Sequence, residues 1–145
     1  MGPSYTGDWV LRVLPGPQDQ DFPEESKKLF LNSTFTVSSQ SDRTGIRLSG
    51  PAVHRKKDLG DSIVSEGIVP GAIQVPGDAQ PIILLVETVT GGYRKIATVI
   101  SADLPLLGQV KPGERVAFQE VPMQEAMTAL QESENHINML KKTSG

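Results

Sequence analysis

Four Pro-Gly pairs divide this 145-residue chain into short apolar segments and so limit the regular structure that it can form. The pairs start at Pro15, Pro70, Pro76 and Pro112. Proline fixes its own φ, and glycine accepts the left-handed backbone that many turns require, so each pair is a turn signal. The apolar runs between the turns are short and rich in β-branched residues, as strands are. The chain should therefore fold as many short strands joined by tight turns.

Composition and turn spacing together predict about eight strands. The strongest strand signals cover 8–14, 33–39, 46–48, 72–74, 81–86, 96–100 and 114–120. Residues 42–45 suit a hairpin connection, and residues 90–93 suit a tight turn that would join the two central strands. Residues 52–61 are charged and aperiodic, which predicts an exposed loop. Strands that pair in sequence order predict a mainly β fold with a closed or nearly closed barrel.

Three segments carry helical signals. Residues 22–31 place a proline early, acids in the first turn and lysines later, an order that complements the helix dipole. Residues 101–108 suit a single turn with Ser101 as its cap. Residues 123–142 predict a longer helix, in which Glu134 interrupts an apolar stripe of Met123, Met127, Leu130, Ile137 and Leu140.

The length of the chain fits one domain with one core. We expect a barrel domain over 1–121 and a helical tail over 122–145. The tail would be either an appendage docked on the barrel or a contact for a homo-oligomer.

Composition excludes several classes of function. The chain has 14 Lys and Arg against 17 Asp and Glu, so it offers no field that attracts nucleic acid or an anionic membrane. The absence of cysteine excludes disulfides, thiolate metal sites and a cysteine nucleophile. The two histidines lie far apart, so we expect no metal site. The longest apolar run, 82–86, is far below the roughly 20 residues that span a bilayer, and we expect a soluble cytoplasmic protein.

Common catalytic motifs are absent from the sequence as well. It contains no phosphate-binding loop and no dinucleotide-binding glycine pattern, and Ser65 lacks the leading glycine of a hydrolase nucleophile elbow. What remains are polar residues in apolar or glycine-rich surroundings: Arg43, Arg47, Ser65, Glu66, Gln74, Gln80, Tyr93, Arg94 and Lys95. Structural alternatives stay open, because Gln74 could be an ordinary outward residue of a strand and Gly91-Gly92 could serve a positive φ.

Eight segments, taken together, resemble the allophanate hydrolase subunit two family, which is the carboxyltransferase domain of urea carboxylase and is also known as the C component of 5-oxoprolinase. The resemblance runs from Asp8 to Phe118, in family order and at similar spacing. The segments are LRVLPGPQ (11–18), DRTGIRLSGP (42–51), SEG (65–67), GAIQVP (71–76), QPIILL (80–85), GGYRKIA (91–97), VISADL (99–104) and PGERV (112–116). The chain departs from the family pattern at Ala79, where glycine is usual, and at 86–90, where it is about one residue shorter.

The resemblance implies a cyclophilin-like barrel. Full-length members contain two such halves in tandem with the active site between them, and this chain resembles the C-terminal half. The urea carboxylase domain moves a carboxyl group from carboxybiotin to urea, whereas 5-oxoprolinase subunits act together in ATP-dependent ring opening of 5-oxoproline. The implied partners are an N-terminal half and a subunit-one protein. No cofactor is expected to be bound covalently; carboxybiotin or ATP would be supplied through the partner subunits.

The resemblance also suggests roles for the candidate residues. Carboxyl transfer holds a carboxylate beside a planar amide or urea-like group, which favours arginine, a glutamine amide and free backbone N–H groups. The implied substrate-binding residues are Arg43, Arg47, Ser65, Gln74, Gln80, Gly91, Gly92 and Tyr93. The implied catalytic residues are Lys95 and Glu66, with Glu66 as a base toward the substrate nitrogen.

Two functions stay open. The chain could contribute one half of a carboxyltransferase or 5-oxoprolinase active site. Alternatively, it could be a non-catalytic ligand-binding or regulatory module that acts with a subunit-one, kinase inhibitor-like partner.

Overall fold

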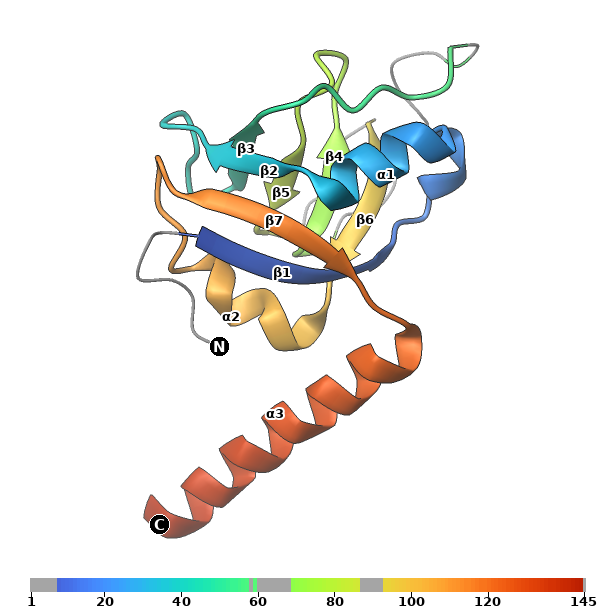
Figure 1. Ribbon diagram of the computed structural model, residues 1–145. Coiled ribbons are helices and arrows are strands. Elements are labelled where there is room, and N and C mark those ends of the chain that lie inside the picture. The colour runs from blue at the N-terminus through green and yellow to red at the C-terminus, as the bar shows by residue number, and fades with distance from the viewer. Residues whose placement is uncertain (1–7, 58, 60–68, 87–92, 145) are drawn as a thin grey trace.

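Seven strands in the described part of the chain close into one mixed barrel (Figure 1). The computed structural model describes residues 8–57, 59, 69–86 and 93–144, with side chains through residue 134. The strands are β1 (Asp8–Pro15), β2 (Thr34–Val37), β3 (Gly45–Ser49), β4 (Ala72–Val75), β5 (Ile82–Leu84), β6 (Arg94–Val99) and β7 (Arg115–Glu120). Their order is β1-β6-β4-β5-β3-β2-β7, and parallel pairing of β7 with β1 closes the ring. The predicted barrel is confirmed.

The order of the strands differs from the predicted sequential pairing. Only β2–β3 and β4–β5 join described strands that are consecutive in the chain. The two strands that flank the tight turn predicted over 90–93 do not pair with each other, because β5 and β6 pair with opposite edges of β4. Residues 87–92, which connect β5 to β6, lie outside the described residues. Turn signals mark where strands end, whereas burial of the apolar faces decides which strands pair.

The main hydrophobic core fills the barrel, and α1 (Glu24–Asn32) closes part of it. Alternate residues point inward along the strands, so Leu11 is buried in β1 while Val10 is exposed. From α1, the Phe30 ring stacks on Phe118 of β7 with centroids 4.5 Å apart, and it lies 6.1 Å from Phe35 of β2. The helix predicted over 22–31 is confirmed.

A buried ion pair holds the short helical segment after β6. This segment consists of a 3-10 turn, η2 (Ser101–Asp103), and α2 (Leu104–Leu107). The predicted cap is wrong: the N-cap residue is Ile100, and no side chain caps the turn. The buried Asp103 carboxylate instead accepts hydrogen bonds from Arg12 Nη2 at 2.6 Å, Nε at 3.0 Å and backbone N at 2.9 Å. This hydrogen bonding raises the pKa of Arg12 and ties the segment to β1.

The charged segment after β3 is less exposed than predicted. In its described part, Val53 is fully buried, and its N–H donates to Ala79 O at 2.9 Å. The Lys56 N–H donates to Asp21 O, also at 2.9 Å, in a short 3-10 turn, η1 (Asp19–Asp21). The segment is irregular, as expected, but two backbone hydrogen bonds and one core residue fix it to the barrel.

A β-bulge in β6 is held by the turn that follows β1, residues 16–18. Ile73 of β4 lies opposite Ala97, but Gln74 lies opposite Lys95, so Ile96 is an extra residue in β6. The Gly16 N–H donates to Ile96 O at 2.9 Å. Gln18 binds the Lys95 backbone twice: its Oε1 accepts the Lys95 N–H at 3.0 Å, and its own N–H donates to Lys95 O at 3.3 Å. The 16–18 turn therefore satisfies the backbone groups that the bulge exposes.

The C-terminal helix α3 (Met123–Ser144) leaves the barrel after β7 and projects away from it (Figure 1). Ala126 docks the helix by packing on Ile100 and Val121 in a second, small core. Met123 and Met127 are each 60% exposed, so the described part of the predicted apolar stripe does not face the barrel. The docked start of the helix is thus observed, and an oligomer contact stays a prediction. No helix in the described part of the chain has the length and hydropathy of a membrane span.

Replacing Gly16 with alanine should destabilise the fold. A Cβ at this position would lie 2.4 Å from Lys95 O and 2.7 Å from Ala97 N, which are backbone atoms that cannot move away cheaply. We expect Gly16→Ala to lower the free energy of unfolding by about 2–3 kcal/mol, as overpacking does, measured by urea denaturation. Gly108→Ala is the matched control, because φ is −72° and the nearest atom to a new Cβ is 3.7 Å away. Equal effects of the two substitutions would contradict this account of the turn.

Ala79 is a described non-glycine residue with positive φ, at 64°, which explains why glycine is usual at this position in the resembling family. The left-handed backbone costs an L-residue roughly 1–2 kcal/mol. Ala79→Gly removes that strain. It also removes a buried methyl group worth about 0.8 kcal/mol and makes the unfolded chain more flexible, and both of these effects favour unfolding. We expect a net change in unfolding free energy within about 0.5 kcal/mol, whereas Ala72→Gly in β4 should cost about 1–2 kcal/mol. A similar loss in both variants by chemical denaturation would show that the φ strain is not relieved.

Deleting residues 122–145 should leave the barrel folded, because the main core contains none of the α3 side chains that the structure describes. The deletion uncovers Ile100 and Val121, so we expect the unfolding free energy to fall by about 1–3 kcal/mol at roughly 25 cal/mol per Å² of newly exposed apolar surface. Circular dichroism during urea titration would measure this change in the unfolding free energy. Loss of a cooperative transition would make the helix part of the folding unit.

Candidate functional site

A cavity on the outer face of β3, β5 and β4 contains two of the predicted substrate-binding residues. It has a volume of about 270 Å³, and we call it the outer-face site. Arg47 of β3 and Gln74 of β4 both line it. Its other lining residues are Asp42, Thr44, Gly45, Ile82, Leu84 and Val86.

Strand register explains why these side chains meet. Arg47 lies opposite Ile82, and Ile82 lies opposite Gln74 on the other edge of β5. Their neighbours Ile46, Ile73 and Ile83 belong to the core, so the alternation of strand residues sends Arg47 and Gln74 outward. The row of backbone partners continues from Gln74 to Lys95 in β6, where the bulge sets the register. Segments that are distant in sequence thus meet in one row across four strands.

Gln74 has an unusual environment for an outward residue. Its side chain is half-buried, and Oε1 is fully buried without a hydrogen-bond partner among the residues that the structure describes. A buried polar atom left unpaired costs about 1–3 kcal/mol, so such atoms are rare in folded proteins. Gln74 thus points outward, as the ordinary alternative has it, but it is only partly exposed, and a role in substrate binding stays a prediction. Gln74 lines the cavity, but a donor in the cavity would reach Oε1 only after the amide group rotates and exchanges the places of Oε1 and Nε2.

Asp42 supports one wall of the outer-face site. Its Oδ1 accepts hydrogen bonds from Thr44 Oγ1 at 2.6 Å, Thr44 N at 2.9 Å and Gly45 N at 3.2 Å. These bonds, led by the one from the Thr44 hydroxyl, lower the pKa of Asp42. The carboxylate stays ionised and is a weak base, so it shapes the turn between β2 and β3. Arg47, on the adjoining strand, supplies an exposed cation.

Three predicted binding residues lie outside this cavity. Gln80 is turned toward β3, where its Oε1 accepts the Gly50 N–H at 2.9 Å, and this bond gives it a structural role. Arg43 is exposed in the connection between β2 and β3. Tyr93 is 37% exposed just before β6 and does not line the cavity.

Of the two predicted catalytic residues, the structure describes only Lys95. Lys95 is opposite Gln74 in the register, but it is only 3% exposed and is not among the lining residues. The other predicted residues, Glu66, Ser65, Gly91 and Gly92, lie outside the described residues. In the described part of the chain, no three His, Cys, Asp or Glu side chains gather as metal ligands would.

Sequence reasoning assigned no role in this site to the residues that support it through hydrogen bonds within the protein. The turn that contains Asp42 and Thr44 was predicted as a hairpin connection over 42–45, but its place in the wall of a cavity was not. Gln18 was part of a motif that carried the family resemblance, yet nothing in the sequence indicated that it would bind the backbone of Lys95. That contact joins residues 77 positions apart.

Comparisons with known proteins agree on one family. The family model "Carboxyltransferase domain, subdomain A and B" matches residues 1–120. The C component of 5-oxoprolinase from Escherichia coli (strain K12) is 37% identical over 131 residues, which cover 90% of this chain and 42% of that protein. Urea amidolyase of Saccharomyces cerevisiae is 32% identical and covers 91% of this chain, but only 8% of its own length is matched.

A solved structure shows the same fold. The crystal structure of the K. lactis urea amidolyase matches 94% of this chain with a TM-score of 0.83 at 27% identity, and the match spans 9% of that chain. This chain spans less than half the length of the matched 5-oxoprolinase components of E. coli and Haemophilus influenzae. The family match over residues 1–120, together with this fold, shows that the chain belongs to the carboxyltransferase domain family of subdomains A and B.

Proposed function

We propose that this chain provides one half of a carboxyltransferase-type active site and that the outer-face site is its substrate-binding part. The observation that carries the proposal is the buried Oε1 of Gln74, which lacks a partner among the described residues and lies near the exposed cation of Arg47. An acceptor oxygen and a guanidinium group in one cavity suit a ligand that has an N–H donor and a carboxylate.

This pairing matches the groups that the relatives handle. The carboxylate of 5-oxoproline would bind Arg47, and its ring N–H would donate to Gln74. For a urea carboxylase-type reaction, Arg47 would hold the carboxylate of carboxybiotin and Gln74 would hold an amide-like N–H, so the residues present fit that group. Carboxybiotin supplies a transferable carboxyl group when it is bound. The apolar side chains of Ile82 and Leu84 would pack against the ring of either ligand.

The rest of the active site would come from partners. The chain spans 42% of the E. coli 5-oxoprolinase component, so we propose that an N-terminal half and a subunit-one protein complete the site in the cytoplasm. ATP, where it is used, would bind to a partner, because this sequence has no phosphate-binding loop.

One observation favours a second candidate, a ligand-binding or regulatory module without chemistry of its own. The carboxylate that lines the described cavity belongs to Asp42, and its lowered pKa makes it a weak base. Lys95 is buried away from the cavity lining. The described part of the site can therefore bind a ligand, but a proton-transferring group would have to come from elsewhere.

A chimera separates the two functions. The matching segment of the E. coli 5-oxoprolinase component is replaced by this chain, the chimera is assembled with its partner subunits, and 5-oxoproline-dependent ATP hydrolysis is measured. Turnover supports the half-site proposal. A folded chimera that binds 5-oxoproline but does not hydrolyse ATP supports the regulatory module, and a folded chimera that does neither rules out both.

Gln74→Ala should separate binding from stability. Removing an unpaired buried oxygen costs the fold little, and we expect a change in unfolding free energy within about 0.5 kcal/mol. The substrate loses a hydrogen bond worth about 1–3 kcal/mol, which corresponds to a loss of roughly 5- to 150-fold in kcat/KM of the chimera.

Gln80→Ala is the matched control, because its oxygen already accepts the Gly50 N–H. We expect Gln80→Ala to lower the unfolding free energy by about 1 kcal/mol and to leave kcat/KM unchanged. If Gln74→Ala keeps full kcat/KM, or if it destabilises the fold more than Gln80→Ala does, Gln74 does not bind the substrate.

A further inference from the structure

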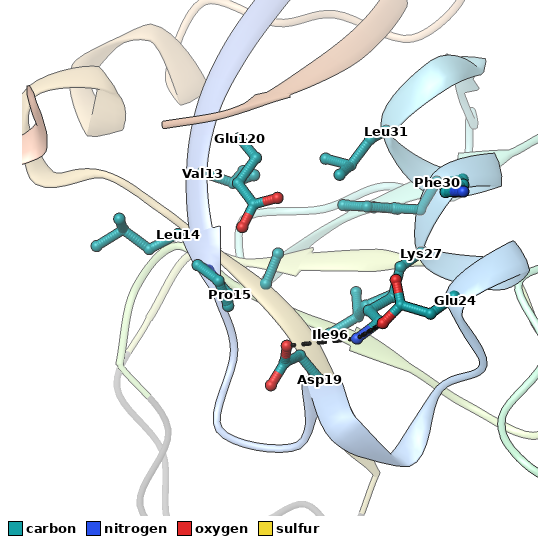
Figure 2. Close-up of a pocket in the computed structure, with 12 residues that line it drawn as sticks. Val13, Leu14, Pro15, Asp19, Glu24, Lys27, Phe30, Leu31, Ile96 and Glu120 are labelled. Atoms are coloured by element: carbon teal, nitrogen blue, oxygen red, sulfur yellow. Dashed lines mark ion pairs between the residues drawn. The ribbon is translucent and has the colours of Figure 1, made fainter. Parts of the chain in front are cut away.

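A second cavity lies between β1, β6 and α1, away from the outer-face site, and we call it the α1 cleft (Figure 2). Its volume is about 380 Å³, and it shares no lining residue with the outer-face site. Small-ligand pockets commonly have volumes of roughly 300–1,000 Å³. The α1 cleft is therefore large enough for a ligand of its own, and the proposed function does not use it.

The floor of the α1 cleft is apolar. Val13 comes from β1, Phe30 and Leu31 come from α1, and Ile96 and Ala97 come from β6. Ile96 is the extra residue of the bulge, so the 16–18 turn that fixes the bulge also fixes this floor. A rigid apolar floor of this kind favours the hydrocarbon part of a ligand.

The edge of the α1 cleft is charged, and one of its cations is already paired. Figure 2 shows Lys27 Nζ between two carboxylates, at 2.9 Å from Glu24 Oε1 and 3.8 Å from Asp19 Oδ2. The hydrogen bond with Glu24 raises the pKa of Lys27 and lowers the pKa of Glu24, so both groups are ionised near neutral pH. Lys27 and Glu24 thus largely cancel each other.

The cleft lining holds one more carboxylate than ammonium groups, which gives it a preference for positive charge. Asp19 is at the longer distance from Lys27, and Glu120 of β7, which also attracts Lys27, lies on the other side of the apolar floor in Figure 2. Lys28 also lines the cleft and offsets one of these two charges. With Lys27 engaged by Glu24, an anionic ligand would meet more negative than positive charge.

We propose that the α1 cleft binds an organic cation, an ammonium or guanidinium group carried on a short apolar chain. The chain lies on the floor formed by Val13, Ile96 and Leu31, and the cation lies between Asp19 and Glu120. This chemistry has two sources: a free amine, or a lysine or arginine side chain of a partner protein flanked by apolar residues.

The test uses the full chain, labelled with ¹⁵N, and three probes of equal length: hexylamine, hexanol and hexanoate. We expect saturable shifts of the amide signals of residues 13–14 and 96–97. The Kd of hexylamine should be on the order of 1 mM and about three- to tenfold lower than that of hexanol, with hexanoate weakest. Equal affinities for the three probes, or no saturable shift, would overturn the proposal.

Charge variants locate the cation. Glu120→Gln should weaken hexylamine binding about three- to tenfold and leave hexanol binding unchanged. Glu25→Gln is the matched control, because Glu25 is an exposed residue of α1 that does not line the cleft. Glu24→Gln releases Lys27 from its ion pair, so it should weaken hexylamine binding and strengthen hexanoate binding. A Glu120→Gln effect no larger than that of Glu25→Gln would refute the assigned position.

A further pair of titrations identifies the source of the cation, with hexylamine and the acetylated, amidated peptide Leu-Lys-Leu as probes. Tighter binding of the peptide assigns the cleft to a segment of a partner protein, and tighter binding of hexylamine assigns it to a free amine. Failure of both to bind overturns the proposal. The outer-face site serves as an internal reference, because 5-oxoproline should shift signals around Gln74 and not those of the cleft.

Discussion

The packing of residues 16–18 on the backbone of β6 is the contact on which the α1 cleft and the register of β6 depend. Gly16 approaches Ile96 closely enough that no side chain fits between them, and Gln18 satisfies the two backbone groups of Lys95. These bonds fix a bulge that shifts the register of β6 against β4 and leaves Ile96 in the floor of the α1 cleft. The outer-face site is placed separately, because Arg47 and Gln74 both lie opposite Ile82 of β5.

Barrel closure places a second requirement on the sequence. β1 pairs in parallel with β7, which comes about 100 residues later, so the ring cannot close until most of the chain is present. Arg12 also lies on β1, and its ion pair with Asp103 holds the segment after β6 against this strand. Because Asp103 is buried, removal of Arg12 would leave an uncompensated buried charge, and the pair therefore specifies where this segment docks. β1 consequently organises both the ring and its helical covering.

Local signals in the sequence predicted elements better than they predicted contacts. The strand at 8–14, the helix at 22–31 and the helix after Pro122 all form, because period, proline placement and charge order act within a few residues. The pairing of β5 and β6 with β4 could not be derived, since two turn signals of equal strength are compatible with several strand orders. In the candidate site, Gln74 and Arg47 were predicted, and both line the cavity. Gln80 was predicted as well, but its side chain accepts the backbone N–H of Gly50, just after β3. Asp19, Lys27 and Glu120 converge only through the fold, so no local pattern indicated the α1 cleft.

If the outer-face site binds substrate as proposed, its chemistry would explain why this domain can fold and still depend on a partner for catalysis. A cavity that holds a carboxylate needs a cation at its edge, and a site that holds an amide needs an acceptor shielded from water. Under the proposed function, Arg47 and Gln74 would meet these two needs from β3 and β4, on either side of β5, where the barrel alone fixes their spacing. A base must approach the substrate from outside the face that binds it, because Asp42 on this face is committed to its turn by three hydrogen bonds. Under the proposed function, this surface would recognise the substrate and leave proton transfer to another group, and a second half that covers the face would exclude water from the bound substrate.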